Sequence, residues 1–293
     1  MIIFIILVFT LLKLIITMCL NLFFLLIYLI WLFYDWETPK RGSRPLKWAR
    51  ELFLWKVLVN YFNLKLVKTE ELNYDKNYIF VIHPHGVLAT GSALIFGTDA
   101  TNFKIIFPKI DIRIATLSVN FWFPLRREFL QIHGIISSDF ESLNYFLNKS
   151  KKGKAIAIVI GGISEMINSK PEEHILTLAN RKGFIKLALK CGKLTFPFKN
   201  FCFPLAYGCS FLTLILPDKL TNKLPSFLRF GILPFKQQII SIVGKPINVK
   251  KCDNPTENQI EELHSKYCLN LNKLFEKYKC EYGKLNKNNE NFK

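Results

Sequence analysis

The stretch "YIFVIHPHGVLATG", residues 78–91, decides the fold and raises the question of function. Its first five residues are all apolar, which is typical of a strand that is buried on both faces of a sheet. Two histidines, His83 and His85, follow at once and stand one residue apart. Because ligand sites collect at the carboxyl ends of strands in α/β sheets, this junction is the first candidate for a functional site.

Strand and helix signals alternate after this stretch. We predict strands at 103–107, 112–117, 155–160 and 238–243, and helices at 138–149, 175–190 and 255–278. Such alternation is typical of an α/β layer with a largely buried sheet.

The N-terminal segment is a membrane anchor by composition. Residues 2–34 are almost entirely Ile, Leu, Phe and Val, and Lys13 is their only charge. A spanning helix needs about 20 apolar residues and two spans need about 40, so the segment predicts one long tilted transmembrane helix or a shallow hairpin. A secretory signal would need a charged start, an apolar core of about 7–15 residues and a small-residue cleavage site, and these features are missing.

The residues that follow the anchor predict its orientation in the membrane. Basic residues and Trp side chains gather between Trp36 and Arg50, which by the positive-inside rule places the body on the cytosolic side. We expect an anchor at 1–36 and an interfacial segment at 37–66, with one amphipathic helix at 46–66 lying against the bilayer. A folded domain at 67–283 and a disordered tail at 284–293 complete the chain.

Charge and cysteine content narrow the class of partner. The net charge is +18, from 40 Lys and Arg against 22 Asp and Glu, so an anionic partner is expected: a membrane surface, nucleic acid or a phosphorylated small molecule. The aromatic residues lie in apolar runs and are not interleaved with basic residues, which argues against nucleic acid. Seven cysteines without metal-ligand spacing indicate a reducing compartment.

Four interpretations compete for the histidine pair. A phosphate loop fails, because Ser92 stands where that loop requires a lysine. The pair could also cap the strand through hydrogen bonds to the backbone. A metal site needs a third ligand from a distant carboxylate or from one of the other histidines, which are His133, His174 and His264.

The fourth interpretation is a general base. Imidazole has an ordinary pKa near 6.5, so it can take a proton from an alcohol as the alcohol attacks an acyl group, an effect of about 10²–10⁴ in rate. Pro84 stiffens the backbone between the two rings, and Gly86 leaves room for a substrate. No Gly-x-Ser-x-Gly nucleophile motif occurs, so direct transfer is favoured over an acyl-enzyme.

The signature His83-Pro84-His85-Gly86 resembles the HPHG motif of the diacylglycerol acyltransferase type 2 family, which also contains monoacylglycerol acyltransferases and wax synthases. Further segments resemble that family in the same order, and together they cover most of residues 60–283. They are FWFPLRRE at 121–128, GGISE at 161–165, RKGFIKLA at 181–188, VGKPI at 243–247 and NPT at 254–256.

The resemblance implies a fold and a reaction. The fold would be an acyltransferase-like layered sheet with helices, and the reaction would move an acyl group from acyl-CoA, as co-substrate, to a lipid hydroxyl on the endoplasmic reticulum membrane. Diacylglycerol is the expected acceptor, giving triacylglycerol, and neither a cofactor nor a metal is implied. Plant members carry Glu-Pro-His-Ser at the signature, so the position of His85 is the steadier one. We therefore expect His85 to be the base with His83 in support, and leave a homo-oligomer open.

The other matching segments supply candidate site residues. Glu165 follows a buried strand and a tight turn, and could orient the His85 ring or bind the acceptor; as a helix-start acid it would need no function. Arg181 could bind the phosphates of CoA through paired hydrogen bonds, or belong to a solvated basic face. For both residues, the resemblance favours the functional role over the structural one. The candidate substrate-binding set is Pro84, Gly86, Gly161, Gly162, Asn180, Arg181 and Lys182.

One segment departs from the family pattern. Residues 193–204 read KLTFPFKNFCFP and lack the family's Phe-Gly-Glu-Asn element. Two classes therefore stay open at this point: an acyltransferase, or a catalytically impaired homologue that binds lipid at the membrane surface.

Overall fold

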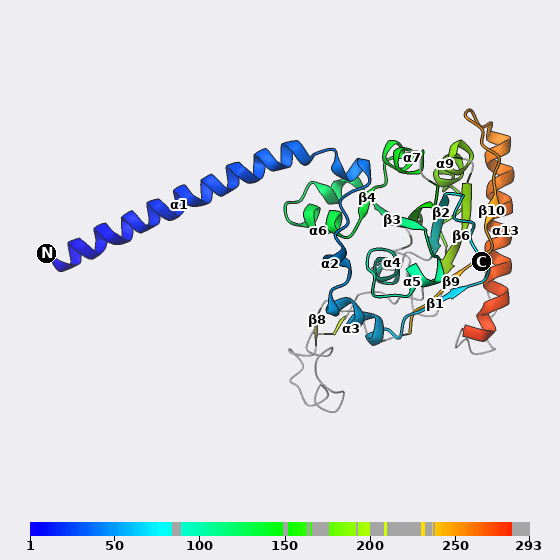
Figure 1. The fold of residues 1–293 in the computed structure, drawn as a ribbon, viewed down its shortest axis with the longest axis horizontal. Helices are drawn as coiled ribbons and strands as arrows, with labels where there is room; N and C mark the ends of the chain where they lie inside the picture. Colours follow the sequence, from blue (N-terminus) through cyan, green and yellow to red (C-terminus); the bar gives the residue numbers. More distant parts are fainter. Residues whose placement is uncertain are drawn as a thin grey trace, which may run out of the picture.

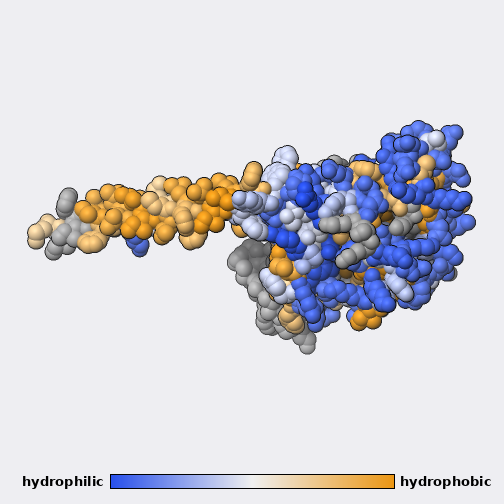
Figure 2. Space-filling model, turned by 45° about the horizontal axis from the view of Figure 1, so that its top comes forward, coloured by the Kyte–Doolittle hydropathy of each residue, from blue (hydrophilic) through white to orange (hydrophobic). Residues whose placement is uncertain are grey.

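The structure is a computed structural model, and it describes residues 1–83, 89–148, 152–162, 165, 176–191, 193–199, 208–209, 230–231, 236 and 238–282. One long helix, α1 (Ile2–Asp35), projects from one side of a mixed α/β body, and helix α13 (Glu257–Tyr282) packs on the opposite side (Figure 1). The visible face of the body is mostly hydrophilic, whereas α1 is apolar along its length (Figure 2). The α/β class predicted from the sequence is confirmed.

A six-stranded sheet forms the centre of the body. Its strand order is β10-β6-β2-β5-β3-β4, and only the β10–β6 pair is antiparallel. The bounds are β10 Ile247–Asn248, β6 Lys193–Lys199, β2 Tyr78–His83, β5 Lys154–Val159, β3 Asp111–Thr116 and β4 Ile135–Ser137. Two small sheets pair β1 (Lys65–Lys68) with β9 (Ile240–Val243) and β7 (Gly208–Cys209) with β8 (Phe230–Gly231).

Strand β2 is buried throughout because helices cover both faces of the sheet. Ile79 and Val81 point into a core formed with α7 (Phe140–Asn148), α9 (Gly183–Cys191) and α13. Phe80 and Ile82 point the other way, toward α4 (Thr90–Phe96) and α5 (Phe103–Ile106). This alternation is the two-residue period of a strand, and it brings the end of β2 between the two cores.

Most of the predicted elements are confirmed, but three are wrong. Residues 103–107 form helix α5 and not a strand, because Phe103 and Phe107, one helical turn apart, both pack on Phe80 at ring distances of 6.1 and 6.2 Å. The helix predicted at 175–190 begins only at Gly183, since residues 176–182 are irregular with a turn at 179–180, and Thr177 and Leu178 bond to neighbouring segments.

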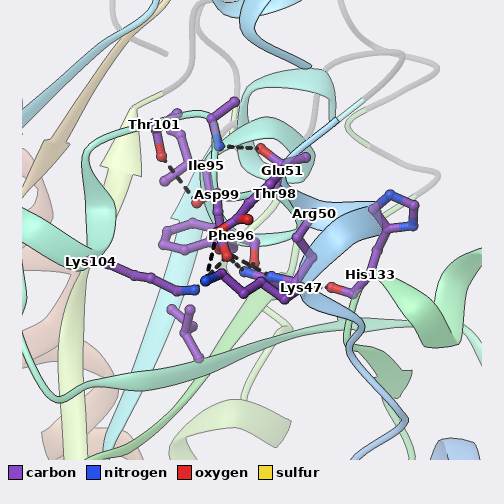
Figure 3. Close-up of polar contacts among 12 residues, drawn as sticks. Lys47, Arg50, Glu51, Ile95, Phe96, Thr98, Asp99, Thr101, Lys104 and His133 are labelled. Carbon is purple, nitrogen blue, oxygen red and sulfur yellow. Dashed lines mark hydrogen bonds and ion pairs between the residues drawn. The ribbon is translucent and has the colours of Figure 1, made fainter. Parts of the chain in front are cut away.

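The third error concerns the interfacial segment. The single helix predicted at 46–66 is two helices, α2 (Lys47–Arg50) and α3 (Phe53–Tyr61), followed by strand β1. The break follows Arg50, whose side chain turns inward and donates to the Asp99 carboxylate at 3.0 Å and to the His133 carbonyl oxygen at 2.6 Å (Figure 3). Burial opposes ionisation of Asp99, but Lys104 and Arg50 outweigh it and lower the pKa of that carboxyl.

Helix α1 runs without interruption for 34 residues, so the hairpin alternative is wrong. At 1.5 Å per residue it is about 50 Å long, and it is apolar enough to cross a membrane. Its last residue, Asp35, is buried against helix α6 (Arg126–Ile132). Arg127 and Gln131 of α6 donate to the Asp35 carboxylate at 2.8 and 2.9 Å, which fastens the anchor to the body.

Candidate active site

His83 is the last residue of β2 and is fixed inside the body. Its side chain is buried, and its Nε2 atom lies 2.9 Å from the hydroxyl oxygen of Tyr267, a fully buried residue of α13. The Tyr267 ring packs edge-on against Phe184 of α9 at 4.9 Å. Helices α9 and α13 therefore hold the imidazole at the carboxyl end of the sheet.

A carboxylate faces the other nitrogen of the same ring. Glu165, which follows β5, places Oε1 at 3.8 Å from His83 Nδ1, and that oxygen accepts the backbone N–H of Thr177 at 2.9 Å. Both side chains are buried, so this charge acts in a medium of low polarity. The distance exceeds a hydrogen bond, so the carboxylate faces Nδ1 without bonding to it directly.

The hydroxyl of Tyr267 stays protonated and is therefore able to donate to His83. Burial raises the pKa of the Tyr267 hydroxyl well above 10, with added contributions from Cys268 and Glu165, so the phenol stays protonated at physiological pH. A protonated phenol can donate to His83 Nε2, which leaves the ring proton on Nδ1, facing Glu165. In the other tautomer, Nε2–H of His83 donates to the same hydroxyl oxygen, because a neutral phenol both donates and accepts.

The two glycines after β5 make room for this carboxylate. A β-carbon at Gly161 would overlap the carboxyl group of Glu165. Gly162 has a φ of +58°, a left-handed conformation that favours glycine, and a β-carbon there would lie 3.9 Å from Nη2 of Arg181. Backbone and carboxylate pack too closely for any side chain at Gly161, which explains the sequence Gly-Gly before the acid.

The remaining predicted site residues divide into two groups. Asn180 and Arg181 lie exposed in the turn before α9, and Lys182 forms an ion pair with Glu261 of α13. Gly162 and Arg181 thus lie at the same end of the sheet as the His83–Glu165 pair. Pro84, His85 and Gly86 lie outside the described residues, as do His174 and the tail 284–293, so the assignment of His85 stays a prediction.

The other described histidines have separate partners. His264 donates to the Leu178 carbonyl oxygen through Nε2 at 3.1 Å, and His133 donates to the Phe129 carbonyl oxygen through Nδ1 at 2.7 Å. Within the part of the chain that the structure describes, no three His, Cys, Asp or Glu side chains converge as metal ligands.

Tyr267 was missed by sequence reasoning. It lies inside the predicted helix at 255–278, where an aromatic side chain indicates core packing. Only its hydroxyl distinguishes it from a phenylalanine, and nothing in the local pattern shows which group that hydroxyl meets.

Comparison with known proteins places this site in a family. The family model described as diacylglycerol acyltransferase matches residues 13–206 and 222–291. The chain belongs to the diacylglycerol acyltransferase family. Diacylglycerol O-acyltransferase 2 of Danio rerio is 37% identical over 278 residues, covering 88% of this chain and 76% of that protein. No solved structure matches the chain.

Human relatives are similar to a comparable degree. The 2-acylglycerol O-acyltransferase 1 of Homo sapiens is 36% identical over 89% of this chain and 83% of its own length. Human diacylglycerol O-acyltransferase 2 is 35% identical over 88% of this chain and 71% of its own length. The resemblance noted in the sequence is confirmed, and with it the enzyme class, an acyltransferase. The family match runs on through the divergent residues 193–204 and does not favour the catalytically impaired lipid binder.

Proposed function

We propose that this protein transfers a fatty acyl group from acyl-CoA to the hydroxyl of an acylglycerol at a membrane, with diacylglycerol as the main acceptor and triacylglycerol as product. The acceptor oxygen attacks the thioester carbonyl carbon, the C–O bond forms, the C–S bond breaks, and CoA leaves as the thiol once it is protonated. His85 takes the hydroxyl proton as general base and returns a proton to the leaving sulfur.

The observation that carries the proposal is the position of His83. The residue that opens the His-Pro-His-Gly signature is buried, bonded to Tyr267 and faced by Glu165. A buried ring bonded through Nε2 is a rigid support for the two residues that follow it, which is what a base needs to meet its substrate in one geometry. In this proposal His83 and Glu165 position the base, and Arg181 and Lys182 meet the phosphates of CoA at the surface.

The membrane arrangement follows from the same proposal. Helix α1 crosses the endoplasmic reticulum membrane, and the body lies on the cytosolic side, where acyl-CoA is available. The names of the relatives support both mono- and diacylglycerol as acceptors, since a diacylglycerol and a 2-acylglycerol acyltransferase are about equally similar to this chain. The transfer requires no metal, because imidazole alone can accept the proton.

The test is acyl transfer by the full chain in membranes. Labelled acyl-CoA is incubated with a panel of acceptors: diacylglycerol, 2-acylglycerol and a long-chain alcohol. We expect label in triacylglycerol above the level of His85→Ala membranes, unchanged by EDTA or phenanthroline. No product with any acceptor would exclude the proposed function, label confined to another acceptor would replace diacylglycerol, and loss with chelator restored by zinc would show a metal-dependent site.

A further inference from the structure

We propose that the body docks on the surface of the bilayer through an apolar belt around α6. One half of the belt consists of Trp48 of α2 and Phe53 of α3, and the other half consists of Trp122, Phe123 and Leu125, which precede α6, and Phe129 of α6. None of its residues belongs to α1 or to the site at His83. In this proposal the belt contacts the lipid of the leaflet from which α1 emerges.

The side chains of the belt expose a large apolar surface to water, which is unfavourable. Leu125 is 79% exposed, Phe53 78%, Trp122 67% and Trp48 63%. Single exposed apolar residues are ordinary, but several large ones gathered around one short helix mark an interaction surface.

Direct contacts make the belt continuous with the anchor. Tyr28 of α1 donates to Glu128 of α6 at 2.9 Å, and Arg127 of α6 pairs with Asp35 at the end of α1. On the other side of α6, the ring of Phe129 lies 6.3 Å from that of Trp55 in α3. Helix α6 accordingly lies on the side of the body from which α1 extends, and α13 lies on the far side (Figure 1).

The two halves of the belt are held in one orientation. Leu46 N–H donates to Ile132 O at 2.8 Å, and the Arg50 guanidinium joins the end of α2 to His133 and Asp99 (Figure 3). Because Asp35 is bonded to α6 and Arg50 to the residue after it, neither half of the belt can turn away from the membrane without breaking buried polar contacts.

The backbone supports the same interpretation. Leu125 has a φ of +64°, a conformation that residues with a β-carbon rarely adopt, and it presents the most exposed apolar side chain of the belt. Both the strained backbone of Leu125 and the exposure of its side chain to water are unfavourable for the body on its own. Insertion of that side chain into lipid would offset the strain.

The positive charges beside the belt favour a bilayer as the occupant and disfavour a second copy of the chain. Basic residues flank the belt, and two of them lie over aromatic rings: Arg44 at 4.7 Å from the Trp31 centroid and Arg126 at 6.0 Å from that of Phe123. Aromatic side chains beside Arg and Lys are typical of the membrane interface, where anionic headgroups complement the charge. A two-fold contact between copies would set these like charges against one another.

The test places a photoreactive residue on each surface of the full chain. The variants Phe123→p-benzoylphenylalanine and Phe53→p-benzoylphenylalanine probe the two halves of the belt. Leu269→p-benzoylphenylalanine is the matched control, since Leu269 is 55% exposed on α13, away from the anchor. Each is reconstituted into vesicles of phosphatidylcholine and phosphatidylserine that contain a radiolabelled phospholipid, then irradiated.

We expect several-fold more lipid label at positions 123 and 53 than at 269. Labelling at either belt position no greater than at 269 would overturn the proposal, and so would crosslinks to a second copy in place of lipid. The readout needs no catalysis, so it stands or falls separately from the acyl transfer proposed above. Positions 123, 53 and 269 are all exposed, so the substitutions leave the core unchanged.

Discussion

His83 is fixed from two sides, by the hydroxyl of Tyr267 and by the carboxylate of Glu165. This arrangement assigns different tasks to the two histidines of the signature. A buried ring with both nitrogens directed at protein groups supports its neighbours, whereas a base must reach a substrate. We therefore distinguish His83, which positions its neighbours, from His85, the proposed base.

The first prediction compares these two histidines. His85→Ala should lower acyl transfer by about 10²-fold or more, because it removes the proton acceptor, whereas His83→Ala should cost less. Expression and membrane association should match wild type for His85→Ala. Turnover is measured in membranes with labelled acyl-CoA. If His85→Ala kept more than roughly a tenth of the activity, His85 would not be the base.

The second prediction concerns Tyr267. Tyr267→Phe keeps the ring that packs on Phe184 and removes the hydrogen bond to His83. A hydrogen bond of about 1 kcal/mol corresponds to a loss of roughly five- to tenfold in kcat. The pH–rate profile should shift as well, with KM for acyl-CoA unchanged, which a merely structural defect would not produce.

The control for Tyr267 is Tyr278→Phe, a matched change in the same helix. It should leave kcat and the pH–rate profile at their wild-type values. Equal profiles for Tyr267→Phe and wild type would remove Tyr267 from the site.

At the scale of elements, α6 connects the anchor to the body. Residues Arg127 and Glu128 belong to the family-like segment at 121–128, and the structure gives them a mechanical role: Arg127 binds Asp35 and Glu128 accepts from Tyr28. Four polar side chains, those of Thr38, Arg44, Arg127 and Gln131, meet the buried Asp35 carboxylate, so each depends on the others.

The third prediction tests this connection. Arg127→Met leaves Asp35 buried without its main cation and should lower the free energy of unfolding by about 3–5 kcal/mol. Arg126→Met, one residue away and exposed, should change it by less than about 0.5 kcal/mol. Denaturant or thermal unfolding in detergent measures both. Coincident unfolding curves for the two variants would show that the Asp35 cluster does not hold the anchor.

The fourth prediction is a pH dependence of stability at His133. Burial lowers the pKa of its imidazole in the native state, with the nearby Arg50 charge acting in the same direction. Below about pH 6.5 the unfolded chain binds a proton that the native imidazole does not, so stability should fall as pH drops from 6.5 toward the lowered native pKa. His133→Gln cannot titrate and should show a flatter fall in Tm between about pH 7.5 and 5.5. Parallel slopes for wild type and variant would contradict this.

At the scale of the molecule, the anchor, the belt and the site define one orientation. Helix α1 and α6 lie on one side of the body and α13 on the other (Figure 1). In the arrangement that we propose, the belt lies on the leaflet and the basic body faces the cytosol with its phosphorylated donor.

The fifth prediction uses the glycosylation sequon at 148–150, Asn-Lys-Ser. Asn148 is exposed at the end of α7, so it would be a ready acceptor if the body entered the lumen. Expressed in a eukaryotic cell, the protein should show no mobility change on glycosidase treatment. Protease added outside sealed microsomes should digest the body. A glycosylated Asn148 with a protected body would reverse the orientation and separate the site from acyl-CoA.

Local pattern in the sequence was enough for the anchor, the buried strand β2 and the α/β alternation, because composition and side-chain periodicity depend on residues close together in the chain. The ordered motifs were enough for the family, and they placed His83 and Glu165 among the site residues before any coordinates. Local pattern failed at 103–107, where an apolar run fits a strand or a helix and packing against Phe80 decided between them.

Only the tertiary structure decided which distant side chains meet. Tyr267 bonds a histidine 184 positions earlier in the chain, and Arg127 bonds an aspartate 92 positions earlier. Neither pairing leaves a local signal, because a tyrosine in an amphipathic helix and an arginine beside another arginine resemble ordinary core and surface residues. The physical reason is that burial makes unpaired polar groups costly, and the partners that satisfy them are chosen by the packing of whole elements.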